Sequence, residues 1–134
     1  MVARGIRNNN PGNIRWGDKW QGLDENGREK DKSFCVFKTP EYGIRALAKI
    51  LRNYRVMHKI TTVAGIIHRF APPTENDTVS YIKHVAEILK VDTDDIIDVR
   101  NEDTMLKLIK AITLHENGEQ PYTDKQILNG IRKV

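Results

Sequence analysis

A glutamate near the end of a predicted helix is the residue of this sequence whose position points most directly to chemistry. Apolar side chains recur at three- and four-residue spacing from residue 101 onward. At about 100° per residue, Glu116 projects about 20° from Met105 and Ile109, in the middle of the face that should point inward. Burial and the negative end of the helix dipole both raise the pKa of a carboxyl group. We therefore expect Glu116 to hold a proton near neutral pH and to act as a general acid.

Cleavage of a glycosidic bond uses such an acid, because the leaving oxygen must receive a proton. The alternative is a glutamate that turns outward from a frayed last turn, or one that is buried against an arginine. Hydrolysis with two carboxylates also needs a partner for Glu116. Glu75 is the first candidate for this second catalytic residue, and Asp77 is the next.

Polar side chains gather beside an aromatic ring in the segment 74–81. Asp77 and Thr78 are followed about one turn later by Tyr81, and this combination would suit the binding of a polar sugar. A helix capped by Asn76 or Asp77 explains the same residues without any ligand. Both interpretations stay open.

The segment 7–20, RNNNPGNIRWGDKW, is dense in asparagine, proline and glycine. Such a composition is typical of turns. The amides of this segment, Asn9 and Asn13 among them, the flanking Arg7 and Arg15, and Trp16 and Trp20 would also suit a saccharide groove. In such a groove amides bind hydroxyl groups and indoles stack on sugar faces.

The positive charge of the chain is concentrated in its first half. Residues 1–60 contain 13 Lys and Arg against 6 Asp and Glu, whereas residues 61–134 contain 9 against 12. This asymmetry favours a polyanionic partner, such as nucleic acid, an anionic membrane or an anionic cell-wall polymer. Because the basic residues are scattered, an ordinary solvated surface explains the asymmetry equally well.

The composition fits one globular domain over residues 1–134. Hydrophobic residues make up 39% of the chain and charged residues 30%, and no apolar run approaches the roughly 20 residues of a membrane-spanning helix. The lone Cys35 rules out an internal disulfide and multi-cysteine zinc sites, and the histidines lack metal-ligand spacing, so we expect no metal. The sequence contains no Gly-rich phosphate loop or serine nucleophile motif, and we expect no cofactor.

Helical periodicity dominates after residue 39. We expect helices from a cap at Thr39, over 62–70, from a cap at Asn76 or Asp77, over 101–115 and over 123–133. The strand candidates are 13–16 and 33–38, with an Asn-Gly turn signal between them. The predicted fold is α+β but mainly α, with a small β-hairpin near the N-terminus.

Four short motifs resemble a known family in an altered order. NNPGNIRWGDKWQG resembles the NLFGIK…W.G stretch of flagellar-type and autolysin N-acetylglucosaminidases, and FKTPEYGIRALAKIL is similar to their F..Y.S…..A..L segment. FAPPTENDTVSYIKHV is similar to their YA…..Y…I element and to the ET..YV..V segment of soluble lytic transglycosylases. The piece comparable to their catalytic glutamate is HENG, at 115–118, which follows these segments here instead of preceding them. Phage lysis or virion proteins that open with RGIRNNNPGNI are similar across nearly the whole chain.

The resemblance implies a circularly permuted, lysozyme-like helical domain that cleaves the glycan strands of peptidoglycan, as a lytic transglycosylase, muramidase or glucosaminidase. It implies that Glu116 is the acid. It also implies that Asn9, Asn13, Ile14 and Tyr81 lie along the glycan groove.

Two rival functions stay open. The first is a non-catalytic virion structural or glycan-binding module with the same fold, and the second is a basic nucleic-acid binder, although we expect peptidoglycan and not nucleic acid as the partner. We expect a monomer without a membrane span, with other virion or lysis proteins as further partners. The N-terminus lacks the apolar segment of a signal peptide. The protein would therefore be made in the cytoplasm and act in the periplasm or cell wall after delivery, or be packaged in a virion.

Overall fold

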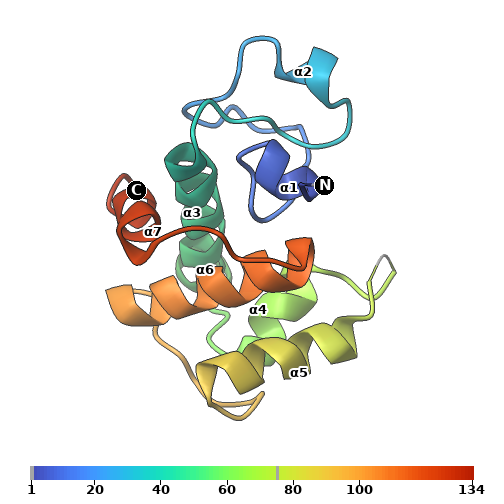
Figure 1. The fold of residues 1–134 in the computed structure, drawn as a ribbon. Helices are drawn as coiled ribbons and strands as arrows, with labels where there is room; N and C mark the ends of the chain where they lie inside the picture. The colour runs from blue at the N-terminus through green and yellow to red at the C-terminus, as the bar shows by residue number, and fades with distance from the viewer. Residues whose placement is uncertain (1, 75) are drawn as a thin grey trace.

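The computed structural model describes residues 2–74 and 76–134, and helices dominate this part of the chain (Figure 1). The mainly helical prediction is therefore confirmed. In chain order the helices are α1 (Arg4–Arg7), α2 (Gly27–Lys30), α3 (Pro40–His58), α4 (Val63–Phe70), α5 (Thr78–Leu89), α6 (Glu102–Asn117) and α7 (Asp124–Ile131).

The predicted helix starts are confirmed, and the side chains of Asn101 and Thr123 supply the expected caps, whereas the side chain of Thr39 makes no capping hydrogen bond. α3 begins with Pro40 after the extended Thr39, so the missing proline N–H costs no helical hydrogen bond. The side chain of Asn101 accepts a hydrogen bond from the Thr104 backbone N–H at 3.0 Å. At α7, Thr123 forms a capping box with Gln126.

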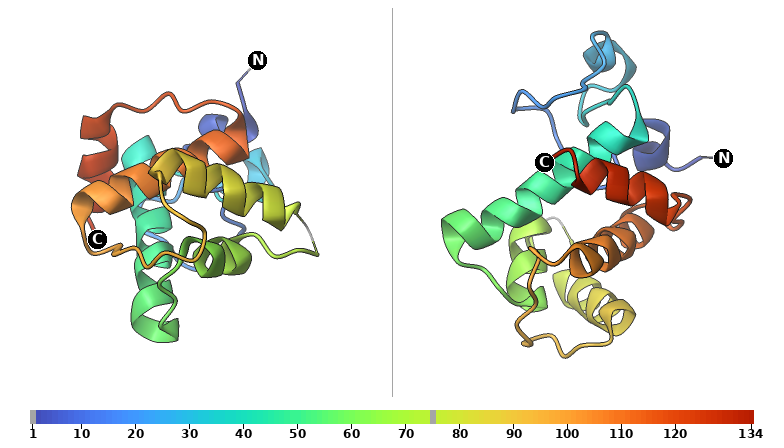
Figure 2. Two further views of the ribbon diagram at one scale, coloured as in Figure 1. Left: turned by 90° about the horizontal axis from the view of Figure 1, so that it is seen from below. Right: turned by 90° about the vertical axis from the view of Figure 1, so that its left-hand side faces the viewer.

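The helices pack around one hydrophobic core. In Figures 1 and 2, α5 and α6 run side by side, α4 packs against α5, and α7 lies along α3. Gly130 allows the last of these contacts, because a Cβ at that position would come within 2.6 Å of Cγ2 of Ile44. Fully buried Leu47, Leu108 and Ile112 fill the space between the helices. No helix of the described residues is long and apolar enough to cross a membrane.

The small hairpin predicted near the N-terminus is not formed as continuous strands in the described residues. The predicted strands meet only in isolated antiparallel bridges, Arg15 with Phe34 and Leu23 with Phe37. Where a hairpin turn was expected, α2 begins at Gly27. The physical reason is that a side chain binds backbone groups that would otherwise pair between two strands. The fully buried Asn10 donates hydrogen bonds to the carbonyls of Ile14 and Cys35.

An ion pair holds the N-terminal segment (residues 2–39) in place. Arg4 binds both carboxylate oxygens of Asp31, at 2.6 and 2.7 Å. Asp31 also accepts hydrogen bonds from the Asn8 side chain and from the backbone of Ser33 and Phe34. These bonds tie α1 to the segment after α2, and the resulting unit sits above α6 in Figure 1.

Candidate functional site

An open cleft of about 410 Å³ lies where the N-terminal segment meets the helices. Its volume falls within the usual range of small-ligand sites. The lining residues come from the N-terminal segment, from α3 and α4, from the loop after α4 and from the end of α6. They are Gly12, Asn13, Ile14, Arg15, Phe34, Ile50, Tyr54, Arg69, Phe70, Ala71, Pro72, Asn76 and Glu116.

Glu116 reaches this cleft from the last turn of α6. The helix ends at Gly118, whose φ of +73° suits a residue without a Cβ and whose N–H donates to the Leu114 carbonyl. The Glu116 side chain is half-buried. It is therefore not turned fully outward, and none of the ion pairs between described residues joins it to an arginine, so neither of the two alternatives that the sequence left open is seen there.

Asn13 holds the Glu116 carboxyl group in place. Its Nδ2 donates a hydrogen bond of 3.0 Å to Oε1 of Glu116, across 103 positions of sequence. Asn13 adopts a left-handed conformation, with φ of +49°, which asparagine tolerates better than most residues. The sequence prediction thus identified two residues that the structure brings into direct contact.

The chain near Asn13 is fastened to the end of α6. The Nδ2 of Asn117 donates to the carbonyls of Pro11 and Thr113, both at 3.0 Å. α1 packs closely here, since a Cβ on Gly5 would approach Oδ1 of Asn117 to 2.4 Å and Oδ1 of Asn13 to 2.7 Å. The position of Asn13 relative to Glu116 therefore depends on three segments that meet at one point.

Tyr81 lies behind Glu116, in the interior. It is 1% exposed, and burial, reinforced by the negative charge of Glu116, raises the pKa of its phenol well above the usual range. Within the described residues its hydroxyl has no hydrogen-bond partner of acceptable geometry. The predicted Tyr81 is thus beside the candidate acid, on the side away from solvent.

Two histidines pack against Tyr81. The ring of His115 stacks on Tyr81 with centroids 3.7 Å apart. Its Nδ1 lies 2.9 Å from Nδ1 of His84, so one ring must donate and the other accept. Burial, together with the nearby His84, lowers the pKa of His115. The rings of Tyr81, His84 and His115 therefore pack together on the interior side of the last turns of α6.

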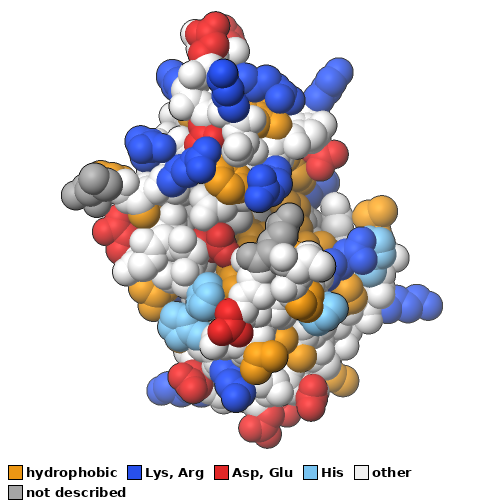
Figure 3. Space-filling view, turned by 90° about the vertical axis from the view of Figure 1, so that its right-hand side faces the viewer, with side chains coloured by type: hydrophobic (Ala, Val, Ile, Leu, Met, Phe, Trp, Pro, Cys, Tyr) orange, Lys and Arg blue, Asp and Glu red, His pale blue; other side chains and the backbone are white. Residues whose placement is uncertain are grey.

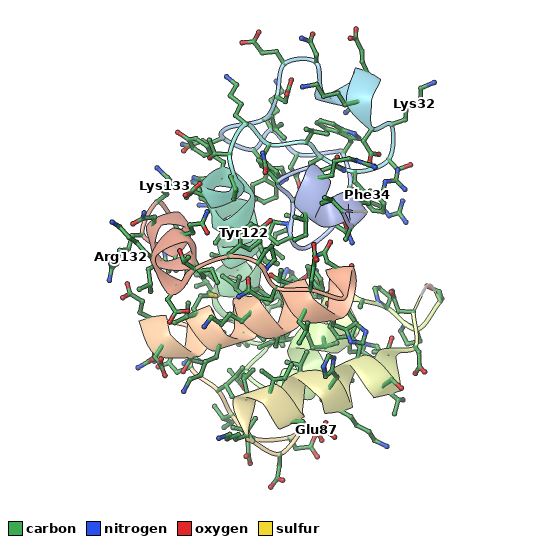
Figure 4. The ribbon with its side chains drawn as sticks, viewed as in Figure 1. Lys32, Phe34, Glu87, Tyr122, Arg132 and Lys133 are labelled. Carbon is green, nitrogen blue, oxygen red and sulfur yellow. The ribbon has the colours of Figure 1, made fainter. Side chains whose placement is uncertain are left out.

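The walls of the cleft carry two arginines on aromatic rings. The guanidinium of Arg15 lies 5.0 Å from the ring centroid of Phe34, beside α1 in Figure 4, and that of Arg69 lies 5.6 Å from the centroid of Tyr54. Figure 3 shows Lys and Arg side chains gathered over the upper part of this face, which the N-terminal segment forms. No pattern in the sequence had indicated Phe34, Tyr54 or Arg69 as site residues.

The other predicted binding residues lie outside the lining of the cleft. Asn9 donates to the carbonyl of Phe37 at 3.0 Å and stabilises the loop. Thr78 is buried and donates to the carbonyl of Ala71 at 2.6 Å, while Trp20 packs against the core. Each of these side chains stabilises the local structure around it, which agrees with the interpretation of these segments as turns and helix caps.

The two candidates for a second carboxylate have different outcomes. Asp77 is exposed and caps α5, accepting a hydrogen bond from the Ser80 N–H at 3.2 Å. Glu75 lies outside the described residues. Its neighbour Asn76 lines the cleft, and the sequence offered Asn76 both as a possible helix cap and as one of the polar side chains that would suit sugar binding. Within residues 2–74 and 76–134, no three His, Cys, Asp or Glu side chains are grouped to hold a metal ion.

The chain is similar to a phage protein along nearly its whole length. It is 42% identical over 133 residues to Protein P5 of Pseudoalteromonas phage PM2, and the match covers 96% of this chain and 80% of that protein. No protein-family model matches the chain.

Proposed function

We propose that this chain, which belongs to the family of Protein P5 of Pseudoalteromonas phage PM2, cleaves the glycan strands of peptidoglycan with Glu116 as the general acid. The name of the relative describes no activity, so the proposal rests on the site. The observation that carries it is the half-buried Glu116 at an open cleft, with Oε1 held at 3.0 Å by Asn13. The phage origin of the relative supports a role at the bacterial cell wall, during entry or lysis, or within a virion.

We infer the lysozyme-like fold from the same features. The motifs that resemble glucosaminidases and transglycosylases contribute Asn13 and Ile14, the start of α3, and the residues from Phe70 to Asn76. The first of these segments lines the cleft that contains Glu116, α3 contributes Ile50 and Tyr54, and the last segment contributes Phe70, Ala71, Pro72 and Asn76. A circular permutation is consistent with this arrangement, because it changes the chain order of segments without changing their places.

The reaction needs one group that both gives and takes a proton. Protonated Glu116 donates to the glycosidic oxygen as the bond from that oxygen to C1 breaks. The resulting carboxylate then accepts the proton of the 6-hydroxyl of the same sugar as its oxygen bonds to C1, which closes a 1,6-anhydro ring. This route returns Glu116 to its protonated state and consumes no water.

The single-acid route fits the lining best, since Glu116 is the one carboxylate among the described lining residues. Hydrolysis would instead require a second carboxylate to activate water or to act as the nucleophile. Glu75 is the residue to test for that role. The products distinguish the routes, because hydrolysis leaves a reducing end and the single-acid route leaves an anhydro end.

The test is digestion of purified peptidoglycan followed by mass spectrometry of the products. We expect anhydro-ended fragments from the wild type and a rate about 10²- to 10⁴-fold lower for Glu116→Gln, the usual contribution of a general acid. Glu119→Gln is the matched control, because Glu119 is exposed three residues further along. An active Glu116→Gln variant would contradict the mechanism, and reducing ends lost in Glu75→Gln would establish hydrolysis.

A non-catalytic glycan-binding module is the second candidate function. The aromatic rings and arginines of the cleft favour it, since they can bind a glycan whether or not Glu116 acts. Co-sedimentation with peptidoglycan separates the two functions. A wild type that binds but releases no fragments at any pH would establish the module and contradict the enzyme.

A further inference from the structure

We infer that Asn117, acting through Asn13, holds the proton of Glu116 between reactions, and that the side-chain amide of Asn13 turns over when Glu116 gives this proton away. The inference rests on the proposed function and deepens it, because it names the residues that keep the acid protonated. Asn13 and Asn117 are positioning residues in this scheme, since each acts through the carboxyl group of Glu116.

Two buried amide oxygens converge beside α1. Oδ1 of Asn117 and Oδ1 of Asn13 both lie within 2.7 Å of the place that a Cβ on Gly5 would take, and the backbone oxygen of Asn10 lies 2.8 Å from it. Neither Oδ1 atom has a hydrogen-bond partner among the described residues. A buried acceptor without a donor costs free energy. Two such acceptors at one point indicate that the site has a second arrangement in which a donor lies between them.

The orientation of the Asn117 amide is fixed. Its Nδ2 donates to the carbonyls of Pro11 and Thr113, both at 3.0 Å. If this amide were reversed, its oxygen would face two carbonyl oxygens, which have no hydrogen to donate. Oδ1 of Asn117 therefore stays beside the Asn13 amide and needs a donor from outside its own residue.

The Asn13 amide can supply that donor. A half-turn about its Cβ–Cγ bond exchanges Oδ1 and Nδ2 with little change of shape. In the orientation observed, Nδ2 donates to Oε1 of Glu116 at 3.0 Å. In the reverse orientation, Nδ2 is directed at Oδ1 of Asn117, and Oδ1 accepts the O–H of Glu116. Both buried amide oxygens then have a donor, but only while Glu116 carries its proton.

The two orientations correspond to two stages of the reaction. Before a glycan binds, the reverse orientation favours protonated Glu116, because loss of the proton would leave Oδ1 of Asn13 facing a carboxylate. When Glu116 gives its proton to the glycosidic oxygen, a half-turn brings Nδ2 of Asn13 to the new carboxylate, which is the orientation observed. Transfer of the 6-hydroxyl proton to Glu116 restores the first state. The amide itself neither gains nor loses a proton.

Other charged or titratable groups surround Glu116, but none of them replaces the amide. They belong to α5 and its cap, to α6 and to the walls of the cleft, and they are Tyr81, His84, Asp77, His115, Arg15 and Arg69. Among the described residues, none donates to Oδ1 of Asn13 or of Asn117. Their influence on Glu116 is therefore present in every variant of the amide, and a comparison of such variants isolates the amide.

The first test is an NMR titration of the protein with carbon-13 in its side-chain carbonyl groups. We expect the Cγ signal of Asn117 to shift with the same midpoint pH as the Cδ signal of Glu116, because Oδ1 of Asn117 gains a hydrogen bond when Glu116 is protonated. In Glu116→Gln the side-chain N–H replaces the acid O–H, so the Asn117 signal should stay at its low-pH position. A wild-type Asn117 signal that does not follow Glu116 would overturn the inference, whether or not the protein cleaves peptidoglycan.

Asn13→Gly separates the amide from mere proximity. Glycine tolerates the φ of +49° at this position, and Asn117 remains next to Glu116 in the chain. We expect the Asn117 signal of this variant to stay constant through the Glu116 titration. A shift as large as in the wild type would show that proximity causes it, and the inference would fail.

The pH profile of cleavage gives the second test. If Asn13 holds the proton, Asn13→Gly should move the fall in activity on the alkaline side about one pH unit lower, as the loss of one hydrogen bond would give. A displacement to higher pH would contradict the inference, because it would mean that Asn13 only stabilises the carboxylate. Asn8→Ala is the matched control, since the Asn8 amide anchors the same segment to Asp31 at 2.8 Å outside the cleft lining. If the wild type cleaves nothing, the proposed function fails, and the titrations decide the inference alone.

Discussion

The Glu116 carboxyl group lies between the amide of Asn13 on the cleft side and the buried hydroxyl of Tyr81 on the interior side. Asn13 donates to it at 3.0 Å, and Tyr81 lies behind it with a buried hydroxyl that finds no partner in the described residues. A buried polar group without a partner costs stability, and such groups are found most often where function requires them. We therefore interpret the buried hydroxyl of Tyr81 as a group that serves the proposed reaction of Glu116.

We predict that Tyr81→Phe leaves the protein at least as stable as the wild type but slows peptidoglycan cleavage about tenfold. Removing an unpartnered buried hydroxyl leaves no new group unsatisfied, whereas the environment of Glu116 changes. Thermal unfolding and turbidity loss of a cell-wall suspension measure the two effects. Tyr122→Phe is the control, because its hydroxyl is also buried and finds no partner among the residues that the structure describes. Tyr122 lies outside the lining of the cleft, in the connection from α6 to α7 (Figure 4). Equal activity of Tyr81→Phe and Tyr122→Phe would show that the Tyr81 hydroxyl has no part in the reaction.

Glu116, Asn13 and the flanking Arg15 could be predicted from the sequence but Arg69 could not, and the difference has a physical cause. The inward face of a helix is encoded in local periodicity, so a carboxylate on that face is visible in one helix. Arg69 becomes a neighbour of the cleft only through the packing of the N-terminal segment against α3 and α4. No local sequence pattern indicates that packing. Tyr54 follows the helical spacing of the apolar residues of α3, so the sequence predicted it to be a core residue.

At the scale of elements, helix starts were predictable and the N-terminal segment was not. Asn101, Thr123 and Asp77 cap their helices as expected, because capping involves residues three apart in sequence. The expected hairpin failed because Asn10 bonds backbone groups 4 and 25 positions away. Side-chain amides of this kind replace a ladder of backbone hydrogen bonds, and composition alone does not distinguish the two.

The contact of α1 with the end of α6 gives a prediction at this scale. A Cβ on Gly5 would meet Oδ1 of Asn117 at 2.4 Å and the backbone oxygen of Asn10 at 2.8 Å. We expect Gly5→Ala to lower the free energy of unfolding by about 1–3 kcal/mol, as overpacking does, and to reduce activity by moving Asn13 away from Glu116. Urea unfolding and the cell-wall assay measure these effects.

Gly65→Ala provides the comparison for Gly5→Ala. Its Cβ would meet the Ile60 side chain at 2.9 Å within the α4 region, and Gly65 is not among the residues that line the cleft. We expect some loss of stability with unchanged activity at a temperature where both variants are folded. Should Gly5→Ala retain full activity under those conditions, α1 would have no part in positioning Asn13.

For the whole molecule, the docking of the N-terminal segment decides whether the cleft exists. Asp31 is 5% exposed and joins Arg4, Asn8 and the backbone at 33 and 34. The hydrogen bonds from Arg4 hold the pKa of the Asp31 carboxyl far below its usual range. Because the pKa is lower in the folded state, this contribution to stability is present above the unfolded pKa, about 4, and is lost as the pH falls below it.

We therefore predict that Asp31→Asn destabilises the protein by about 1.5–3 kcal/mol at pH 7, the range of hydrogen bonds to a charged group. The free energy of unfolding of the variant should also fall less steeply below about pH 4 than that of the wild type, because the variant has no carboxyl group to protonate at this position. Urea unfolding between pH 2.5 and about 7 measures both effects. Asp98→Asn is the matched control, since Asp98 also binds an arginine with both oxygens, Arg100 at 2.9 and 3.0 Å, but on the exposed surface. Exposed pairs contribute less than about 1 kcal/mol, so equal losses in the two variants would show that burial of Asp31 does not set the stability of the N-terminal segment.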